Sequence, residues 1–268
     1  MRLKEYLKNK IPENKLQYLP SSFDIIGQIC IIELKPEIKK YSKLIGNSIL
    51  KLNPNIKSVF KKSSAVKGKY RTHKLTYIVG INNKETIHKE NKALFKLDVE
   101  KCYFSPRLSN ERLRISRLIK KNESILVMFS GIGSYNFVIL KNSSPKEVYC
   151  IEVNKTAHKY ALENLKLNKI NENKIKLYNG DVKKIMPKIN KKFDRIIMPL
   201  PKESFFFLNL ALKKIKKKGT IHLYTFIEEE NEVEEKMKKY TKKFRILKIT
   251  KCGVYSSRIS RVCVDVKI

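Results

Sequence analysis

The chain has 268 residues, and its 59 lysines and arginines against 25 aspartates and glutamates give a formal net charge of +34. Hydrophobic residues make up 42% of it, which supports a packed core and excludes a wholly disordered chain. No apolar run approaches the roughly 18 residues of a membrane span, and no secretory signal is visible, so we expect a cytoplasmic protein without a membrane partner.

The excess of positive charge indicates a polyanionic partner, because each phosphate contact releases a counterion. Residues 1–100 and residues 101–268 are both basic, as expected if one nucleic acid contacts both parts. Only ten of the cations are arginine, however, and a genome poor in G and C also produces lysine-rich chains. The five cysteines are scattered, without a CxxC or Cys/His cluster, which predicts reduced thiols and no metal site.

The first hundred residues predict a small α+β domain. Residues 1–20 are a separate N-terminal segment, with a short helix that breaks at Pro12, and the small domain itself covers 21–100. Apolar residues at helical spacing predict one amphipathic helix over 36–51. Short apolar runs predict strands at 25–32, 58–60, 75–79 and 93–99.

Strands and helices alternate after residue 100, which predicts a parallel sheet with right-handed crossovers over 101–268. The expected strands are 124–129, 147–151, 174–178, 193–198 and 220–226. The expected helices are 110–119, 135–140, 156–167, 205–215 and 229–240. Two last strands near 244–249 and 261–266 predict an antiparallel edge pair. The predicted fold class is therefore α/β, with a smaller N-terminal α+β domain.

Polar or glycine-rich segments follow four successive predicted strands. Ligands of parallel sheets bind at the edge formed by the carboxyl ends of the strands, where these segments lie. The loop FSGIG at 129–133 allows close approach of the backbone and precedes a helix N-terminus. Glu152 is placed to accept the two hydroxyls of a ribose, and Asp181 to accept an adenine amino proton. The segment MPLP at 198–201 ends the fourth strand. The residues assigned to this ligand are Gly131, Gly133, Glu152, Val153, Asp181, Val182 and Pro199.

The details of this edge favour S-adenosylmethionine over a dinucleotide. The 21 residues from Gly131 to Glu152 suit a nucleotide-binding βαβ unit, but the third glycine of a dinucleotide motif is replaced by Asn136. One departure is Val127, which stands where methyltransferases of this class often carry an acidic residue before the loop.

Four stretches together resemble archaeal and eukaryotic tRNA (guanine-37-N1)-methyltransferases. They are YFSPRLSNERLRI at 103–115, MFSGIG at 128–133, RIIMPLPKESFFFL at 195–208 and GTIHLYTF at 219–226. The resemblance covers almost the whole chain from about Ser21. It implies a class I Rossmann-like methyltransferase domain, S-adenosylmethionine as methyl donor, and tRNA as partner, bound at position 37 of the anticodon loop. No obligate protein partner is evident.

The resemblance also implies roles for individual residues. Glu111 matches the carboxylate proposed as base for guanine N1, and Arg71 matches an arginine that stabilises negative charge on O6. Tyr103 and Arg107 match residues that hold the target base and backbone, and Arg112 and Phe129 match residues beside the methyl donor.

Simpler readings remain open for these residues. Glu111 is also compatible with a charged helical face, Arg71 with a phosphate contact, and Tyr103 with the core. His222 and Cys150 we expect to be buried in the core.

Pro199 departs from the family pattern, which has asparagine there in an N-L-P motif. A proline version, with glutamate at the ribose position, resembles the archaeal subgroup that also methylates C7 of 4-demethylwyosine. Pro199 and Pro201 would then shape the pocket for a larger base, so we expect Pro201 to be a substrate contact. Two alternatives are an aminocarboxypropyl transferase of the wyosine pathway and a catalytically silent tRNA-binding protein.

Overall fold

The structure is a computed structural model that describes residues 3–64, 68, 70–256 and 258–268. The chain divides into two compact units, which we describe separately. Unit 1 comprises Met1–Lys89 and Leu94–Pro106, and unit 2 comprises Glu90–Ala93 and Arg107–Ile268. Among the described residues, no helix has the length and apolar character of a membrane span.

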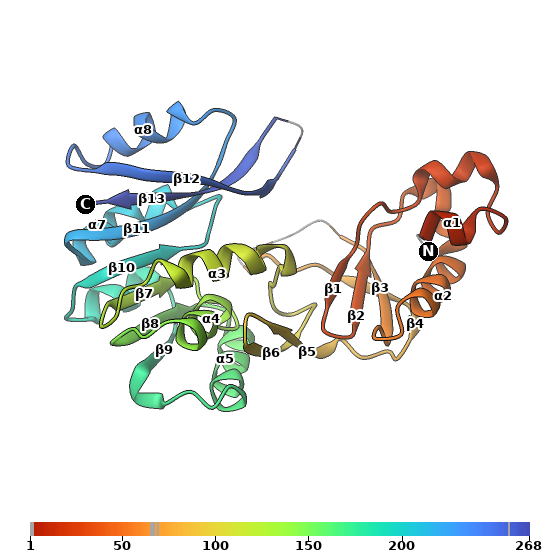
Figure 1. Cartoon of the computed structure of the whole chain (residues 1–268), viewed down its shortest axis with the longest axis horizontal. Helices are drawn as coiled ribbons and strands as arrows, with labels where there is room; N and C mark the ends of the chain where they lie inside the picture. Colours follow the sequence, from red (N-terminus) through yellow and green to blue (C-terminus); the bar gives the residue numbers. More distant parts are fainter. Residues whose placement is uncertain (1–2, 65–67, 69, 257) are drawn as a thin grey trace. The chain divides into compact units, whose positions relative to one another are not determined.

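Unit 1 contains a four-stranded sheet in the order β1-β2-β3-β4 (Figure 1). Its strands are β1 (Asp24–Ile26), β2 (Ile29–Ile32), β3 (Ser58–Lys62) and β4 (Leu75–Gly80). Its helical segments are α1 (Leu3–Leu7), η1 (Glu13–Tyr18), η2 (Pro36–Tyr41) and α2 (Ser42–Leu52). Leu7, Ile11 and Leu16 lie in one apolar cluster with residues of β2, α2 and β3, so residues 3–19 share the core of this unit.

One sequence expectation in this region was wrong, and one strand was not predicted. The predicted single strand over 25–32 is a tight hairpin, because Gly27 adopts a φ of +55° and reverses the chain between β1 and β2. The charged segment Glu85–Glu90 forms β5, which pairs with β6 (Ala93–Asp98). The sequence conceals this strand, because its buried positions include the polar residues Thr86 and Glu90, whereas the apolar Ile87 is exposed.

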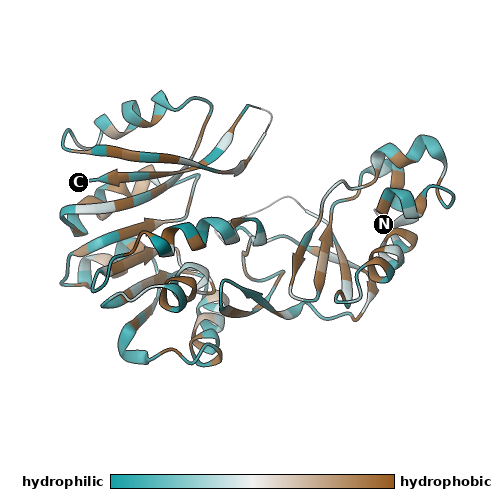
Figure 2. Cartoon of the chain, viewed as in Figure 1, coloured by the Kyte–Doolittle hydropathy of each residue, from teal (hydrophilic) through white to brown (hydrophobic). Residues whose placement is uncertain are grey.

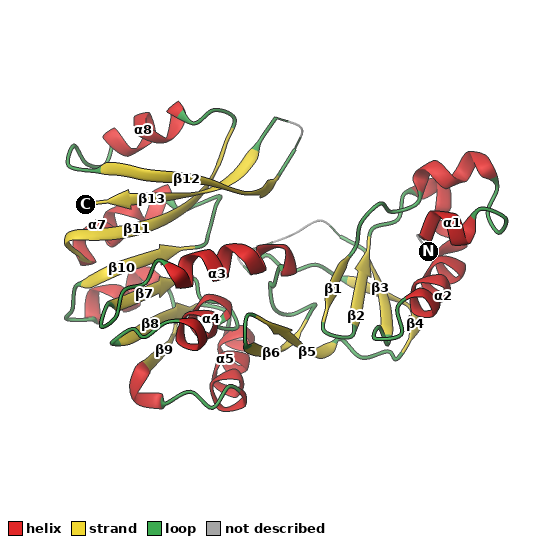
Figure 3. Ribbon diagram, in the orientation of Figure 1, coloured by secondary structure: helices red, strands yellow, loops and turns green. Residues whose placement is uncertain are grey.

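Unit 2 is built on a seven-stranded sheet in the order β12-β13-β11-β10-β7-β8-β9 (Figure 3). Its strands are β7 (Ser124–Met128), β8 (Glu147–Glu152), β9 (Ile175–Asn179), β10 (Phe193–Met198), β11 (Ile215–Ile227), β12 (Arg245–Val254) and β13 (Ser260–Lys267). The helices are α3 (Ser109–Arg117), α4 (Ser134–Asn142), α5 (Lys155–Leu167), α6 (Val182–Ile185), α7 (Leu208–Lys214) and α8 (Asn231–Lys238). Short 3₁₀ segments are η3 (Pro106–Leu108), η4 (Glu172–Lys174), η5 (Met186–Lys188) and η6 (Phe205–Phe207).

The sheet confirms the predicted α/β class. Strands β9, β8, β7, β10 and β11 are parallel, and β13 and β12 add the expected antiparallel pair. The chain runs outward from β7 through β8 to β9, then returns to place β10 on the other side of β7. The switch point therefore lies between β7 and β10, where a ligand of such a sheet is expected.

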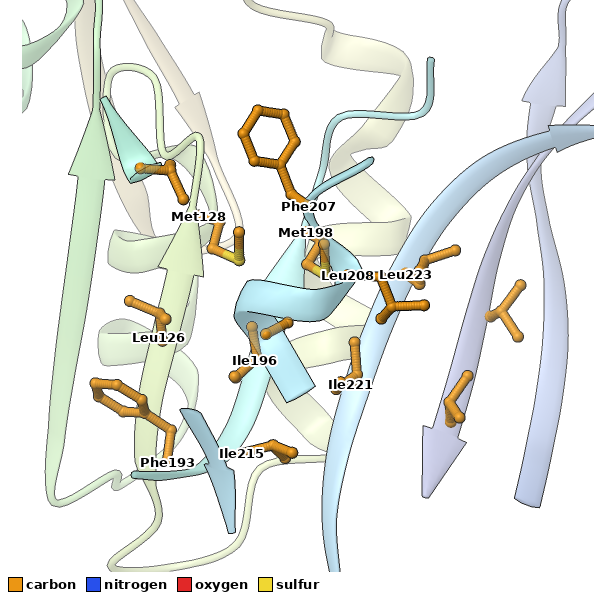
Figure 4. Packing of buried hydrophobic residues seen from close by; sticks show 14 of the residues in the cluster. Leu126, Met128, Phe193, Ile196, Met198, Phe207, Leu208, Ile215, Ile221 and Leu223 are labelled. Atoms are coloured by element: carbon orange, nitrogen blue, oxygen red, sulfur yellow. The ribbon is translucent and has the colours of Figure 1, made fainter. Parts of the chain in front are cut away.

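Side chains alternate between the two faces of the central strands, as their period of two requires. One face forms a large apolar cluster with residues of α7 and α8, and Figure 4 shows Leu126, Ile196, Ile221 and Leu223 in it. Figure 2 shows these strands as mostly hydrophobic. The intervening residues of β10, β11 and β13 are partly polar yet buried, namely Arg195, His222 and Asp265.

Candidate active site

The loop after β7 has an unusual backbone conformation. Phe129, Gly131 and Gly133 have φ values of +58°, +56° and +90°. Positive φ in an aromatic residue is strained, and such strain occurs mainly where a structure holds a ligand loop in place. A Cβ added to Gly133 would lie 2.3 Å from Cε2 of Phe137, so glycine is required there for space as well as for conformation.

Glu152 binds this loop directly. Its Oε2 accepts a hydrogen bond from the Gly131 amide at 2.7 Å, and its Oε1 accepts one from the Asn154 amide at 2.7 Å. Burial raises the pKa of Glu152, although backbone amides counteract part of the rise. Each carboxylate oxygen has two acceptor sites, so these bonds leave capacity for ligand hydroxyls. Val153, which follows Glu152, is half-buried.

Asp181 lies at the end of the next strand and caps α6, where its Oδ1 accepts from the Lys183 amide at 2.9 Å. Val182 begins this helix and is buried in the apolar cluster. The structure thus brings Asp181 to the same edge of the sheet as Glu152, since β8 and β9 are adjacent and parallel.

The segment after β10 forms a compact turn. Ser204 donates to the carbonyl oxygens of Met198 and Leu200 at 3.0 and 2.9 Å, which holds Pro199 and Pro201 in place. Both prolines are half-buried. Nearby, the Phe129 ring packs edge-on against Phe207 with centroids 4.9 Å apart. The loops after β7 and β10, on either side of the switch point, are therefore in contact.

Glu111 lies in the first turn of α3 and is buried, with 7% of its surface exposed. Arg114 donates to Oε2 from Nε at 2.7 Å and to Oε1 from a terminal nitrogen at 2.8 Å. The Tyr224 hydroxyl donates to Oε1 at 2.6 Å. The Tyr224 ring in turn contacts Tyr135, which follows the glycine loop by two residues, at 5.9 Å. The reading of Glu111 as part of a merely solvated face is therefore wrong.

Arg112, the next residue, is almost completely buried and pairs with Glu90. A terminal guanidinium nitrogen donates to Glu90 Oε2 at 2.6 Å, alongside a second, parallel bond from Nε. This ion pair joins α3 to the end of β5. Glu90 was not expected from the sequence, because it lies in β5, a strand whose buried positions are polar.

The other predicted substrate residues lie on exposed or partly exposed segments. Arg107, in η3, is exposed, and Tyr103 is 41% exposed, which argues against a core role for that ring. Arg71 is half-buried and lies in a turn with a φ of +54°, its amide donating to the Gly68 carbonyl at 3.2 Å. Arg71 and Tyr103 belong to unit 1, whereas Arg107 and Glu111 belong to unit 2.

Four residues near Glu111 were not assigned to the site from the sequence: Arg114, Arg195, His222 and Asp265. Burial of His222 and Cys150 is confirmed, with both fully inaccessible. His222 is nevertheless hydrogen-bonded on both ring nitrogens, to Asp265 at 2.6 Å and to Arg195 at 2.7 Å. The sequence did contain a signal for these residues, because His222 and Asp265 interrupt otherwise apolar strands at positions that share one face of the sheet.

Three of the described residues, His222, Cys263 and Asp265, have potential metal-ligating atoms within 4.8 Å of one another. Their surroundings do not suit a cation. The guanidinium of Arg195 is bonded to His222, and that of Arg114 is bonded to Asp265. Two positive charges at this position would repel a metal ion.

Comparison with known proteins places the chain in a family. A TRM5/TYW2 methyltransferase domain matches residues 86–250, and a TYW2 N-terminal domain matches residues 3–84.

Three curated relatives differ in their reported activities. The tRNA (guanine(37)-N(1))-methyltransferase Trm5b of Pyrococcus abyssi is 43% identical over 81% of this chain and 63% of its own length. The tRNA 4-demethylwyosine(37)-methyltransferase Taw21 of Saccharolobus solfataricus is 37% identical over 91% of this chain and 92% of its own. An aminocarboxypropyltransferase of Methanocaldococcus jannaschii that acts at C7 of 4-demethylwyosine-37 in tRNA(Phe) is 34% identical over 79% and 86%. The chain spans about six tenths of the length of the Trm5b relatives it matches, 63% and 58%.

Solved structures agree with these matches. A complex of aTrm5 with tRNALeu has a TM-score of 0.90 at 31% identity and covers 100% of this chain and 78% of that one. Methanocaldococcus jannaschii TYW2 in complex with AdoMet has a TM-score of 0.68 at 28% identity, covering 92% and 98%. The chain therefore belongs to the TRM5/TYW2 methyltransferase family.

Proposed function

We propose that this protein transfers a methyl group from S-adenosylmethionine to N1 of guanosine-37 in tRNA. The observation that carries the proposal is the placement of the glycine loop, Glu152, Asp181 and Pro199 at the carboxyl ends of neighbouring parallel strands around the switch point. Solved relatives bind AdoMet and tRNA, and the +34 net charge suits a polyanionic substrate. A cytoplasmic location stays a prediction.

The residues at this edge fit S-adenosylmethionine. Gly131 in the positive-φ loop is half-buried and has no side chain that could block a ligand, and the half-buried Phe129 offers an apolar wall. Glu152 would accept from the ribose hydroxyls and Asp181 from the adenine amino group, with Val153 and Val182 beside them. When bound, the donor supplies a methyl group activated by a sulfonium charge. Fully buried Val127 provides no acidic partner for the methionine amino group.

The protein's own groups would manage the proton and the charge on the base. The N1 proton of guanine would pass to Glu111 while negative charge develops on O6. N1 would form its bond to the methyl carbon as the bond of that carbon to the donor sulfur breaks, which leaves S-adenosylhomocysteine. Oε2 of Glu111 accepts one bond within the described part of the chain and keeps a second acceptor site for this proton. Arg71 would stabilise the O6 charge, and Tyr103, Arg107 and Pro201 would hold the base and backbone of the nucleotide.

The test is a methylation assay with labelled donor and unmodified tRNA, followed by mass spectrometry of nucleoside 37. We expect 1-methylguanosine and S-adenosylhomocysteine. Glu111→Gln should lower the rate of methyl transfer by about 10²-fold or more while donor binding persists. Donor binding without methylation of any tRNA would support the catalytically silent alternative. Methylthioadenosine as product would support the aminocarboxypropyl transferase.

A second activity is favoured by Pro199. Proline has no side-chain amide, so the group that asparagine offers in the common N-L-P motif is missing here. The Taw21 relative, whose alignment covers 91% of this chain, acts on 4-demethylwyosine-37. We therefore expect label on C7 when tRNA carrying 4-demethylwyosine is supplied, and Pro199→Asn should reduce this activity more than methylation of guanosine-37. Absence of label on C7 would remove the second activity.

A further inference from the structure

A continuous set of hydrogen-bonded side chains, buried except for the partly exposed Arg114, connects Glu111 to the centre of the sheet. Arg114 bridges two carboxylates, those of Glu111 and Asp265. It donates to Asp265 Oδ2 at 2.7 Å and to Oδ1 at 3.2 Å. His222 lies behind Asp265 and Arg195 lies behind His222, and Arg195 ends on Glu123 at 2.9 and 3.1 Å. We call Glu111, Arg114, Asp265, His222 and Arg195 the Glu111 network.

The sheet register explains why these residues meet. His222 on β11 is paired directly with Asp265 on β13, and the neighbours of both on their strands point into the apolar cluster on the opposite face. Arg195 on β10 has the same orientation, since Ile196 and Met198 belong to that cluster. Helix α3 supplies Glu111 and Arg114, which continue the network from these three polar residues.

The direction of each hydrogen bond in the Glu111 network is determined by chemistry. Arginine only donates, so Arg195 must donate to Nε2 of His222. The proton of a neutral His222 is then on Nδ1, which donates to Asp265. Burial lowers the pKa of His222 despite the neighbouring carboxylate, which keeps the ring neutral. Burial raises the pKa of Asp265, but its bonds to His222 and Arg114 lower the pKa by more. Asp265 is therefore ionised and accepts hydrogen bonds from both residues.

With these hydrogen-bond directions, the Asp265 carboxylate accepts from one edge of the Arg114 guanidinium. The guanidinium is planar and rigid, so fixing two of its edges on two carboxylates fixes the orientation of Glu111 as well. We propose that Asp265 and His222 are positioning residues for Glu111, acting through Arg114, in the methyl transfer described above. This inference rests on the proposed function, because the proposed methylation of guanine N1 is the reaction that gives Glu111 a proton to accept.

Asp265→Asn is the first test. Asparagine has the same shape, but its amide would face either His222 or Arg114 with a donor, so one bond of the network is lost. Under single-turnover conditions we expect the rate of methyl transfer to fall by about 10- to 100-fold, as misplacement of a reacting group does. The affinities for donor and tRNA should change by less than about twofold, because Asp265 is 5% exposed and holds protein groups.

Asp194→Asn is the matched control. Asp194 lies on β10 beside Arg195, accepts from the Ser124 amide at 2.8 Å and pairs with Lys216 at 2.9 Å. Within the described residues, its side chain makes no hydrogen bond to the Glu111 network. It should lower stability without slowing methyl transfer. Equal slowing by both variants, or no slowing by Asp265→Asn in an active enzyme, would overturn the inference. If the wild type itself does not methylate guanosine-37, the proposed function fails instead.

A measurement on the wild type covers the case in which Asp265→Asn does not fold. With four histidines in the chain, the imidazole nitrogens can be assigned by ¹⁵N NMR of histidine-labelled protein. We expect His222 to be neutral with its proton on Nδ1 at pH 7. A protonated ring, or the proton on Nε2, would contradict the direction of the bonds and refute the positioning role.

Discussion

The buried ion pair between Arg112 and Glu90 allows a quantitative prediction. The two side chains are 2% and 4% exposed, so Arg112→Met leaves the Glu90 charge in a site with almost no access to water. Removal of one partner from such a pair costs about 3–5 kcal/mol. With a urea m-value of about 2 kcal/mol/M, the unfolding midpoint should fall by about 1.5–2.5 M.

The double variant Glu90→Leu, Arg112→Met should recover most of this loss, because apolar replacement of a whole buried pair is close to neutral. The chain has no tryptophan, so urea unfolding is best followed by far-UV circular dichroism. A loss below about 1 kcal/mol in Arg112→Met, or a double variant as unstable as the single one, would refute this account of the pair. Donor affinity of the stable double variant then tests the predicted contact of Arg112 with the donor, which requires weaker binding than in the wild type.

Three other predictions concern the ligand edge and the substrate. Gly133→Ala should destabilise the protein more than Gly68→Ala in thermal unfolding, since both have positive φ but only the first places a methyl group against Phe137; equal effects would show that crowding is absent. Asp181→Asn should keep the cap of α6, and thus stability within about 0.5 kcal/mol, but should weaken donor binding in calorimetry. Unchanged affinity would exclude the adenine contact. Affinity for tRNA should fall by about 10³-fold or more between 50 and 200 mM salt while donor affinity barely changes, and equal sensitivity would contradict separate sites.

The sequence by itself determined the architecture of unit 2 and the residues at its ligand edge. Alternating strands and helices require parallel pairing, and the carboxyl ends of parallel strands meet at one edge. That rule was sufficient to bring Glu152 and Asp181 together, although 29 residues separate them in the sequence. It needed only the order of the elements and the residue that ends each strand.

Only the tertiary structure decided which residues surround Glu111. Arg114 and Asp265 are separated by 151 residues, and His222 and Asp265 by 43. Their contacts depend on the register of β11 against β13 and on where α3 packs across that face. A local pattern marks these side chains as polar residues in buried strands, but the partner that offsets the cost of burying each one comes from a distant segment. Such pairing is set by packing of the whole sheet, which no single stretch of the sequence encodes.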